Sequence, residues 1–102
     1  MNVYIIYFLL LKNGKIYTGI TNDLERRISE HFEEKDPKSY TSRFKVEKLI
    51  GYLEFSSPNE AIDAEKKIKK WSHAKKIALL NQDWDTLKML SKKYFSKDES
   101  DE

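Results

Sequence analysis

The sequence contains no cysteine. This excludes disulfide bonds, zinc sites built on thiolates and cysteine nucleophiles, and it agrees with a reducing compartment, for which we expect the cytoplasm. Any bound metal ion must therefore be held by oxygen atoms or by imidazole nitrogen.

The chain also lacks a long hydrophobic run. Its longest apolar stretch, residues 3–11, is too short to span a bilayer and has neither the basic flank nor the small-residue cleavage site of a signal peptide. We interpret it as a buried strand and expect no membrane partner. The sequence has no internal repeat or low-complexity segment, and its 102 residues are a usual length for one domain.

A strong excess of charge of one sign is missing as well, because the net charge is only +2. Residues 96–102 hold one lysine and four acids, a charge of −3, so the rest of the chain carries +5. That balance permits a polyanionic partner without requiring one. Since the last residues are polar and lack apolar anchors, we expect one domain over residues 1–95 and a disordered acidic tail over residues 96–102.

Hydrophobic patterning in the first part of the chain predicts two strands and a helix. Residues 3–11 are apolar at almost every position, which is typical of a central strand, and residues 15–20 return as a second strand after a turn. Asn22, with Glu25 three residues later, predicts the start of a helix. Its apolar stripe is expected to consist of Leu24, Ile28 and Phe32.

The second part of the chain predicts a loop, a third strand, a helix and two shorter amphipathic segments. Residues 33–45 are polar and indicate an ordered loop or lid, and residues 49–55 resume strand character. Ser57, Pro58 and Glu60 predict a helix that runs to about Trp71, and two shorter amphipathic segments follow near residues 77–80 and 84–90. The order β-β-α-β-α-α predicts the α+β class, with helices packed on a small three-stranded antiparallel sheet.

The register of the first hairpin decides whether Tyr7 and Tyr17 lie on the same face of the sheet. If Asn13-Gly14 is a two-residue loop, Tyr7 and Tyr17 lie on opposite faces of the sheet. If the loop is residues 12–14, with Gly14 in the left-handed conformation, Tyr17 faces Leu9 and Tyr7 is its diagonal neighbour. Periodicity alone does not choose between them, and two aromatic residues packing in a core remain an equal alternative.

Glu65 lies within the apolar pattern of the second predicted helix, four residues after Ala61, one after Ala64 and three before Ile68. A carboxylate at the edge or middle of a packed face needs a partner. One interpretation is a buried salt bridge with a lysine or arginine, and the other is a ligand for a hard divalent cation such as Mg²⁺.

Arg27 and His31 form an i, i+4 pair on the first predicted helix, beside its apolar stripe. Both side chains can therefore reach one ligand, and an arginine there could hold a phosphate and stabilise negative charge in a transition state. The competing interpretation is ordinary surface polarity of a helix.

Motifs in fixed order resemble the GIY-YIG nuclease superfamily: I-I-Y at residues 5–7, Y-T-G at 17–19 and N-D-L-E-R-R-I-S-E-H at 22–31. T-S-R-F at 41–44, E-A-I-D-A-E-K-K-I-K-K-W at 60–71 and N-Q-D-W at 81–84 look like its small stand-alone branch, similar to the N-terminal domain of the excision-repair incision nuclease. The first motif departs from the family pattern because it lacks the glycine, and Tyr4 is a second candidate for its tyrosine.

By position, the resemblance implies the site residues Tyr7, Tyr17, Arg27, His31, Glu65 and, across a small gap, Asn81. It implies one Mg²⁺ or Mn²⁺ held by Glu65 and water. Tyr17 would position or deprotonate the attacking water and Tyr7 would orient it. Arg27 would neutralise charge on the phosphate, and His31 would relay protons or contact the nucleic-acid backbone.

The resemblance implies an endonuclease acting on nucleic acid, for which we expect DNA, in repair or recombination. Two alternatives stay open. One is a catalytically silent nucleic-acid-binding or repair-accessory module of the same fold. The other is a protein-interaction domain in which Trp71, Trp84 and Tyr94 form a partner surface.

Overall fold

The computed structural model describes residues 3–33 and 38–91. They fall into two compact units, Met1–Lys70 and Trp71–Glu102. Among the described residues, those of the first unit form the sheet and three helices, and those of the second form helices without a strand. A single domain over residues 1–95 stays a prediction, and the predicted tail at 96–102 and Tyr94 lie outside the described residues.

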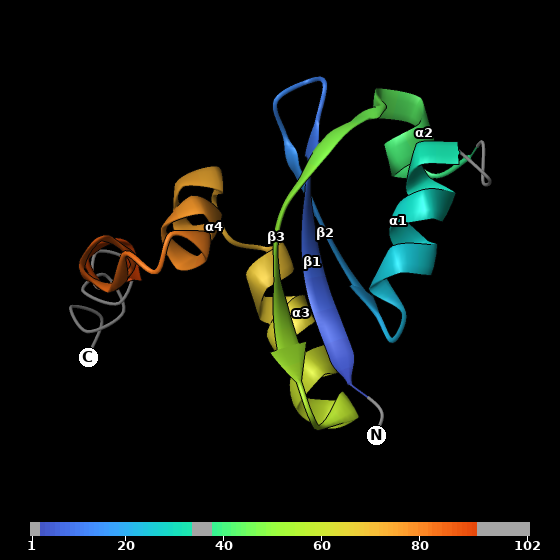
Figure 1. The fold of residues 1–102 in the computed structure, drawn as a ribbon. Coiled ribbons are helices and arrows are strands. Elements are labelled where there is room, and N and C mark those ends of the chain that lie inside the picture. The colour runs from blue at the N-terminus through green and yellow to red at the C-terminus, as the bar shows by residue number, and fades with distance from the viewer. Residues whose placement is uncertain (1–2, 34–37, 92–102) are drawn as a thin grey trace. The chain divides into compact units, whose positions relative to one another are not determined.

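A three-stranded antiparallel sheet forms the centre of the first unit, in the order β2-β1-β3 (Figure 1). Its strands are β1 (Tyr4–Leu11), β2 (Ile16–Thr21) and β3 (Val46–Phe55). In β1, residues 6–9 are at most 1% exposed, as an apolar central strand covered on both faces requires. The predicted α+β class and three-stranded sheet are confirmed.

The hairpin between β1 and β2 has the three-residue loop that brings the two tyrosines to one face. The Leu11 N–H donates to the Lys15 carbonyl over 2.9 Å, and the Gly14 N–H donates back to the Leu11 carbonyl over 2.9 Å. Gly14 has φ +86°, the left-handed conformation that glycine tolerates best. This register pairs residue 9 with residue 17 and residue 7 with residue 19.

The two faces of the sheet carry different helices, because successive side chains of a strand point to opposite faces. Tyr7, Leu9 and Leu11 form a core with side chains of α1 (Leu24–Glu33) and α2 (Tyr40–Phe44), which lie beside the same side of the sheet in Figure 1. Ile6 and Phe8, both 0% exposed, point to the other face, against which α3 (Pro58–Lys69) packs through β2 and β1.

The start of α1 differs from the prediction by one residue. The carboxylate of Asp23, rather than the side chain of Asn22, accepts the N–H of Arg26 over 3.2 Å, and the helix begins at Leu24. Thr21 explains the shift, because its hydroxyl oxygen accepts the Asp23 N–H over 3.0 Å and holds the chain in a turn for one residue longer. Glu25 is therefore not part of a capping box.

The apolar stripe of α1 is shorter than predicted. Leu24 and Ile28 pack against the core, as expected, but Phe32 is 49% exposed. Phe32 lies in the last turn of α1, which ends at Glu33.

The predicted loop over residues 33–45 is wrong where it covers α2. Ser39 caps this short helix, its hydroxyl accepting the Ser42 N–H over 3.2 Å. Thr41 and Ser42 are buried in spite of their polar side chains, which is why hydrophobic periodicity misses the helix. The next strand, β3, accordingly begins at Val46, three residues before the predicted start at residue 49.

The later helices agree closely with the prediction. Ser57 caps α3 with Pro58 in its first turn, and the helix ends at Lys69, two residues before Trp71. In the second unit, α4 (His73–Leu80) and a helical segment over residues 84–91 confirm the two amphipathic helices. Within the described ranges, no helix is long and apolar enough to cross a membrane.

Candidate functional site

Tyr7 of β1 and Tyr17 of β2 lie on the sheet face that carries α1 and α2. Their ring centroids are 6.3 Å apart and their planes are inclined by 41°. Tyr7 is 1% exposed, whereas Tyr17 is only partly buried at the edge of the core. The three-residue hairpin loop is the local cause, since a register slip of one residue would send one ring to the opposite face.

Gly19 makes room for Tyr7. The two residues are direct partners across the β1–β2 ladder. A Cβ atom built at Gly19 would overlap the Cζ and hydroxyl oxygen of the Tyr7 ring. The tyrosine therefore lies across the glycine backbone, and its hydroxyl reaches past β2 toward α1. The glycine of the Y-T-G motif is therefore required for steric reasons, which the spacing of residues in the sequence does not reveal.

His31, in the last turn of α1, contacts both tyrosines. The Tyr7 hydroxyl oxygen and His31 Nε2 are hydrogen-bonded at 2.8 Å. The imidazole ring centroid lies 5.6 Å from that of Tyr7 and 5.4 Å from that of Tyr17. On its other side, His31 Nδ1 is hydrogen-bonded to the Thr41 hydroxyl of α2 at 2.7 Å. The imidazole is therefore held by both of its nitrogens.

Burial and neighbouring charges set the protonation states of this pair. Burial raises the pKa of the Tyr7 phenol well above its ordinary value of 10.0, and the nearby Tyr17 phenol raises it further. Burial lowers the pKa of His31, and the Arg27 guanidinium lowers it further. At neutral pH the bond therefore joins a neutral phenol to a neutral imidazole.

Arg27 lies one helical turn before His31, close enough to influence the pKa values of both His31 and Tyr7. Its Nε is 3.8 Å from a carboxylate oxygen of Glu30, a loose ion pair with side chains 43% and 37% exposed. The Arg27 Nε is buried and has no hydrogen-bond partner among the residues that the structure describes. An arginine with an unpaired N–H group can bind an anionic ligand.

Sequence reasoning missed the contribution of α2 to this cluster. Tyr40 stacks on Tyr17 with 6.3 Å between ring centroids and an angle of 23°, and it contacts Phe44 at 4.6 Å. Thr41, which is 1% exposed, holds His31. The T-S-R-F motif marked this segment by resemblance, but it assigned no role to the threonine.

Glu65 lies on α3, which packs on the opposite sheet face from the tyrosines. It is in helical register with Ala61 and Ile68, which are both buried, and its own side chain is 15% exposed. Its carboxylate oxygen lies 3.9 Å from Nζ of Lys69, a side chain that is 62% exposed. The salt bridge to a lysine that the alternative interpretation expects is therefore present, but its cationic partner is solvent-exposed, and the choice between a structural and a metal role stays open.

The remaining predicted site residue, Asn81, belongs to the second unit. It is exposed, it ends α4, and its N–H donates to the Ile77 carbonyl over 2.9 Å. The structure thus brings together Tyr7, Tyr17, Arg27 and His31 within the first unit. It gives no reason to group Asn81 with them.

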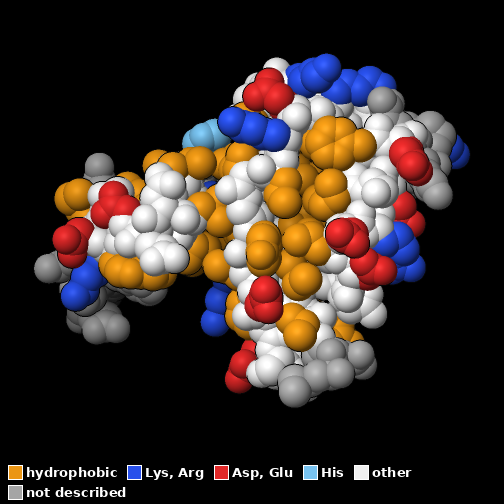
Figure 2. Space-filling view, viewed as in Figure 1, with side chains coloured by type: hydrophobic (Ala, Val, Ile, Leu, Met, Phe, Trp, Pro, Cys, Tyr) orange, Lys and Arg blue, Asp and Glu red, His pale blue; other side chains and the backbone are white. Residues whose placement is uncertain are grey.

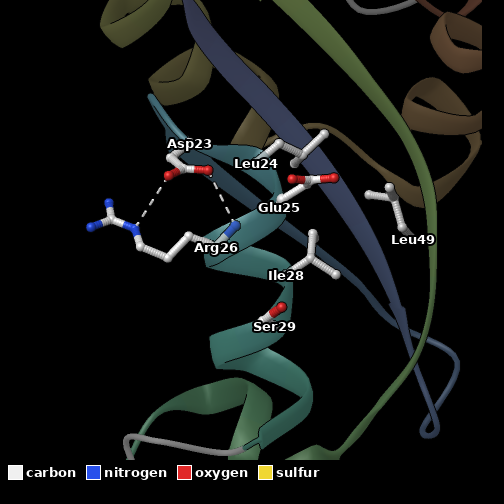
Figure 3. A pocket seen from close by; sticks show the side chains of 7 residues that line it. All are labelled: Asp23, Leu24, Glu25, Arg26, Ile28, Ser29 and Leu49. Carbon is white, nitrogen blue, oxygen red and sulfur yellow. Dashed lines mark hydrogen bonds and ion pairs between the residues drawn. The ribbon is translucent and has the colours of Figure 1, made fainter.

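An open groove follows the first half of α1 on the first unit. Figure 3 shows its lining, which is Asp23, Leu24, Glu25, Arg26, Ile28, Ser29 and, across from α1, Leu49 of β3. It contains none of the predicted site residues, and an exposed ion pair of Arg26 with Asp23 at 3.8 Å lies on its rim. We therefore regard the groove as separate from the tyrosine cluster.

Glu65 fits a divalent-cation site of the simplest kind. Across the described ranges, no group of three or more His, Cys, Asp or Glu side chains is arranged to hold a metal ion. A Mg²⁺ ion needs only one protein carboxylate when water and a substrate phosphate complete its shell. Glu65 supplies a half-buried carboxylate whose lysine partner is loosely placed. The Thr18 hydroxyl, buried on the same sheet face, has no hydrogen-bond partner in the described part of the chain.

Comparison with known proteins gives one consistent result. A family model described as the GIY-YIG catalytic domain matches residues 1–78. The match includes every predicted site residue except Asn81.

Relatives that the chain matches over most of their length carry the name UPF0213 protein. A UPF0213 protein from Cupriavidus pinatubonensis is 42% identical over 73 residues, which is 72% of this chain and 80% of the relative. A UPF0213 protein from Staphylococcus saprophyticus is 33% identical over 82 residues, covering 80% of this chain and 99% of the relative. The solution NMR structure of a UPF0213 protein from Bacillus halodurans is 34% identical, with a TM-score of 0.50, and covers 78% of this chain and 84% of that one.

Proposed function

The chain belongs to the GIY-YIG nuclease superfamily, and from this membership we propose that it is an endonuclease that hydrolyses phosphodiester bonds with a divalent metal ion, Mg²⁺ or Mn²⁺. Its proposed substrate is DNA, in repair or recombination, and its proposed compartment is the cytoplasm. The proposed site residues are Tyr7, Tyr17, Arg27, His31 and Glu65, with Asn81 as a further candidate.

One observation carries the proposal: two tyrosines, a histidine and an arginine from three elements converge on one sheet face. Tyr7, Tyr17 and His31 are in mutual ring contact, and Arg27 lies close enough to influence the pKa values of Tyr7 and His31. A hydrophobic core would not need a histidine hydrogen-bonded through both nitrogens, nor an arginine beside it.

Their different burial divides the roles of the two tyrosines. Because its pKa is raised, Tyr7 stays a neutral phenol at physiological pH and can orient a water molecule but cannot deprotonate it. Tyr17 is the more accessible phenol, and it is the residue that we assign to the attacking water. Arg27 would offset the charge that builds on the phosphate oxygens.

The metal ion, when bound, would polarise the scissile phosphate and make its coordinated water more acidic. Glu65 is the residue that would hold it. Glu65 and the tyrosines belong to opposite faces of the sheet, but β2 is an outer strand, so the two faces meet along its edge. A phosphate at the edge of β2, next to Tyr17, is the position from which both could be reached.

Basic side chains near α2 support a polyanionic substrate. Figure 2 shows Lys and Arg side chains gathered over the junction of α2 and β3, where Arg43 and Lys45 are exposed. On α3, Lys66, Lys67 and Lys69 are exposed as well. Such residues add a salt-dependent attraction to phosphate without specifying sequence.

The test is cleavage of single-stranded, duplex and branched DNA and RNA by the full chain, with Mg²⁺ and with EDTA. We expect Mg²⁺-dependent cleavage that is lost in Tyr17→Phe and in Glu65→Gln. Binding without cleavage by the wild-type chain, unaffected by Glu65→Gln, would favour the silent binding module instead. Absence of nucleic-acid binding at low salt would favour the protein-interaction domain.

A further inference from the structure

Thr41 has a buried hydroxyl group and is not among the proposed site residues. It is 1% exposed, and its oxygen lies 2.7 Å from His31 Nδ1 and 3.2 Å from the Ser39 hydroxyl oxygen. His31 Nε2 in turn lies 2.8 Å from the Tyr7 hydroxyl oxygen. These contacts form one hydrogen-bonded chain from α2 through α1 to β1.

The chain can be polarised in two directions. A neutral imidazole carries one N–H, so one ring nitrogen donates and the other accepts. Either Nδ1–H donates to Thr41 and Nε2 accepts the Tyr7 proton, or Thr41 donates to Nδ1 and Nε2–H donates to the tyrosine oxygen. The two arrangements give opposite roles to Tyr7, which donates to His31 in the first and accepts from it in the second.

Acidity favours the first direction. A phenol is a much stronger hydrogen-bond donor than an alcohol, and its oxygen is a weaker acceptor because the ring withdraws its lone pair. The best match therefore places the Tyr7 O–H on the bare imidazole nitrogen and the imidazole N–H on the threonine oxygen. Burial is the main reason why the imidazole of His31 stays neutral, and among its charged neighbours Arg27, on the same helix, outweighs Glu30 in its effect on the histidine pKa. Among the described residues, the other contacts of His31 are the hydroxyls of Tyr7 and Thr41 and the aromatic ring of Tyr17.

We propose that Thr41 is a positioning residue of the nuclease site: it accepts a hydrogen bond from His31 Nδ1–H, fixes this tautomer, and so holds the Tyr7 hydroxyl as a donor to Nε2. The inference deepens the proposed function and rests on it. With its proton directed at His31, Tyr7 presents only oxygen lone pairs to the site, so it can accept a hydrogen bond from a water molecule but cannot donate one to the phosphate.

The first arm of the test reads the tautomer without any reaction. Long-range ¹H–¹⁵N NMR spectra of the full chain distinguish Nδ1–H from Nε2–H for each ring, and the exposed His73 provides an internal reference. We expect His31 to be in the Nδ1–H form in the wild type and in Thr41→Ser, and to lose that preference in Thr41→Val. An Nε2–H tautomer in the wild type, or an unchanged tautomer in Thr41→Val, overturns the proposal.

The second arm measures Mg²⁺-dependent cleavage. Thr41→Val keeps the volume of the side chain, and we expect kcat to fall roughly ten- to hundredfold with KM unchanged. This is the loss found when a metal-ligating histidine is deprived of its second hydrogen bond, and His31 is held in the same way. Thr41→Ser should restore most of kcat. The matched control is Ser42→Ala, because Ser42 is also buried in α2 but its hydroxyl has no hydrogen-bond partner in the described ranges. A loss in Ser42→Ala equal to that in Thr41→Val would mean that α2 is merely destabilised, and would overturn the positioning role.

The two arms separate the inference from the function beneath it. If the wild-type chain cleaves nothing, the nuclease proposal fails and Thr41 loses its catalytic meaning, even when the tautomer is as expected. If the wild type cleaves but Thr41→Val leaves kcat intact, the positioning role alone fails. Should Thr41→Val not fold, the wild-type tautomer and the kcat of Thr41→Ser still decide the matter.

Discussion

The ring of Tyr7 lies against the backbone of Gly19, its partner across the β1–β2 ladder, so closely that any side chain at Gly19 would occupy the space of the phenol. This contact lets a tyrosine from the central strand pass over the outer strand and reach His31. The contact between Tyr7 and His31 thus depends on the absence of a methyl group at Gly19.

Gly19→Ala should disable the site while leaving the fold intact. The added methyl group must displace the Tyr7 ring, at a cost of about 1–3 kcal/mol in unfolding free energy, and break the bond to His31. Cleavage and urea unfolding measure the two effects. Gly14→Ala is the control. Because Gly14 has φ +86°, the alanine should lower the unfolding free energy by roughly 1–2 kcal/mol, but its Cβ would meet no atom within 4 Å and would not touch the site. Equal loss of cleavage in both variants would show that stability, rather than the position of Tyr7, is responsible.

Glu65→Gln should melt near the wild-type temperature. The ion pair with the exposed Lys69 is worth less than about 1 kcal/mol, so its loss leaves no buried charge behind. Stabilisation by Mg²⁺, followed by thermal unfolding, should vanish together with cleavage, whereas Lys69→Gln should keep both. A large drop in melting temperature without any metal effect would return Glu65 to a structural role.

The stability contributed by His31 should fall on acidification. The folded-state pKa lies below the ordinary value of 6.5, so in the interval between the two the unfolded chain binds more protons. The native state is therefore favoured above pH 6.5 and loses this advantage as the pH falls through the folded-state pKa. Urea unfolding of the wild type and of His31→Gln, from about pH 5 to pH 8, measures the contribution of His31 to the unfolding free energy. The difference between the two should shrink toward low pH, and a difference that grows there would contradict the pKa direction.

Binding to nucleic acid should weaken steeply with salt, because the attraction of exposed lysines and arginines to phosphate is screened. Removing residues 96–102, which carry a charge of −3, should strengthen binding at low salt. Fluorescence anisotropy with a labelled oligonucleotide at several salt concentrations measures both effects. Binding that ignores salt would argue against a phosphate-directed surface.

Much of the fold can be predicted from local sequence patterns that tertiary packing leaves unchanged. The apolar run of β1 predicts a central strand, and the Ser57-Pro58 start of α3 is observed as expected. The helix α2 could not be predicted in this way, because its buried residues include Thr41 and Ser42, whose polarity hides the periodicity. The predicted start of α1 is one residue early because the Thr21 hydroxyl accepts the Asp23 N–H and the Asp23 carboxylate in turn accepts the Arg26 N–H, so that Asp23 takes the capping position.

The site was predictable only as far as residue types and a resemblance allow. Sequence offered two hairpin registers, and tertiary structure decided between them through the loop at residues 12–14. Nothing in the spacing of Tyr7, His31 and Thr41 along the chain indicates that one hydrogen-bonded chain joins them, because it arises only when three elements pack. The assignment of Asn81 and the metal role of Glu65 remain predictions.

The hydrogen-bonded chain that ends at Thr41 joins residues 24 and 10 positions apart in sequence, on three separate elements. A molecule in which α2 has not yet docked leaves the imidazole free to turn, and the phenol at residue 7 then has no fixed partner. Competence to cut would arise only when all three elements are packed together, rather than growing in proportion to folding. On this proposal, a half-folded chain, whether newly synthesised or heat-damaged, cuts the surrounding nucleic acid far more slowly than the folded chain.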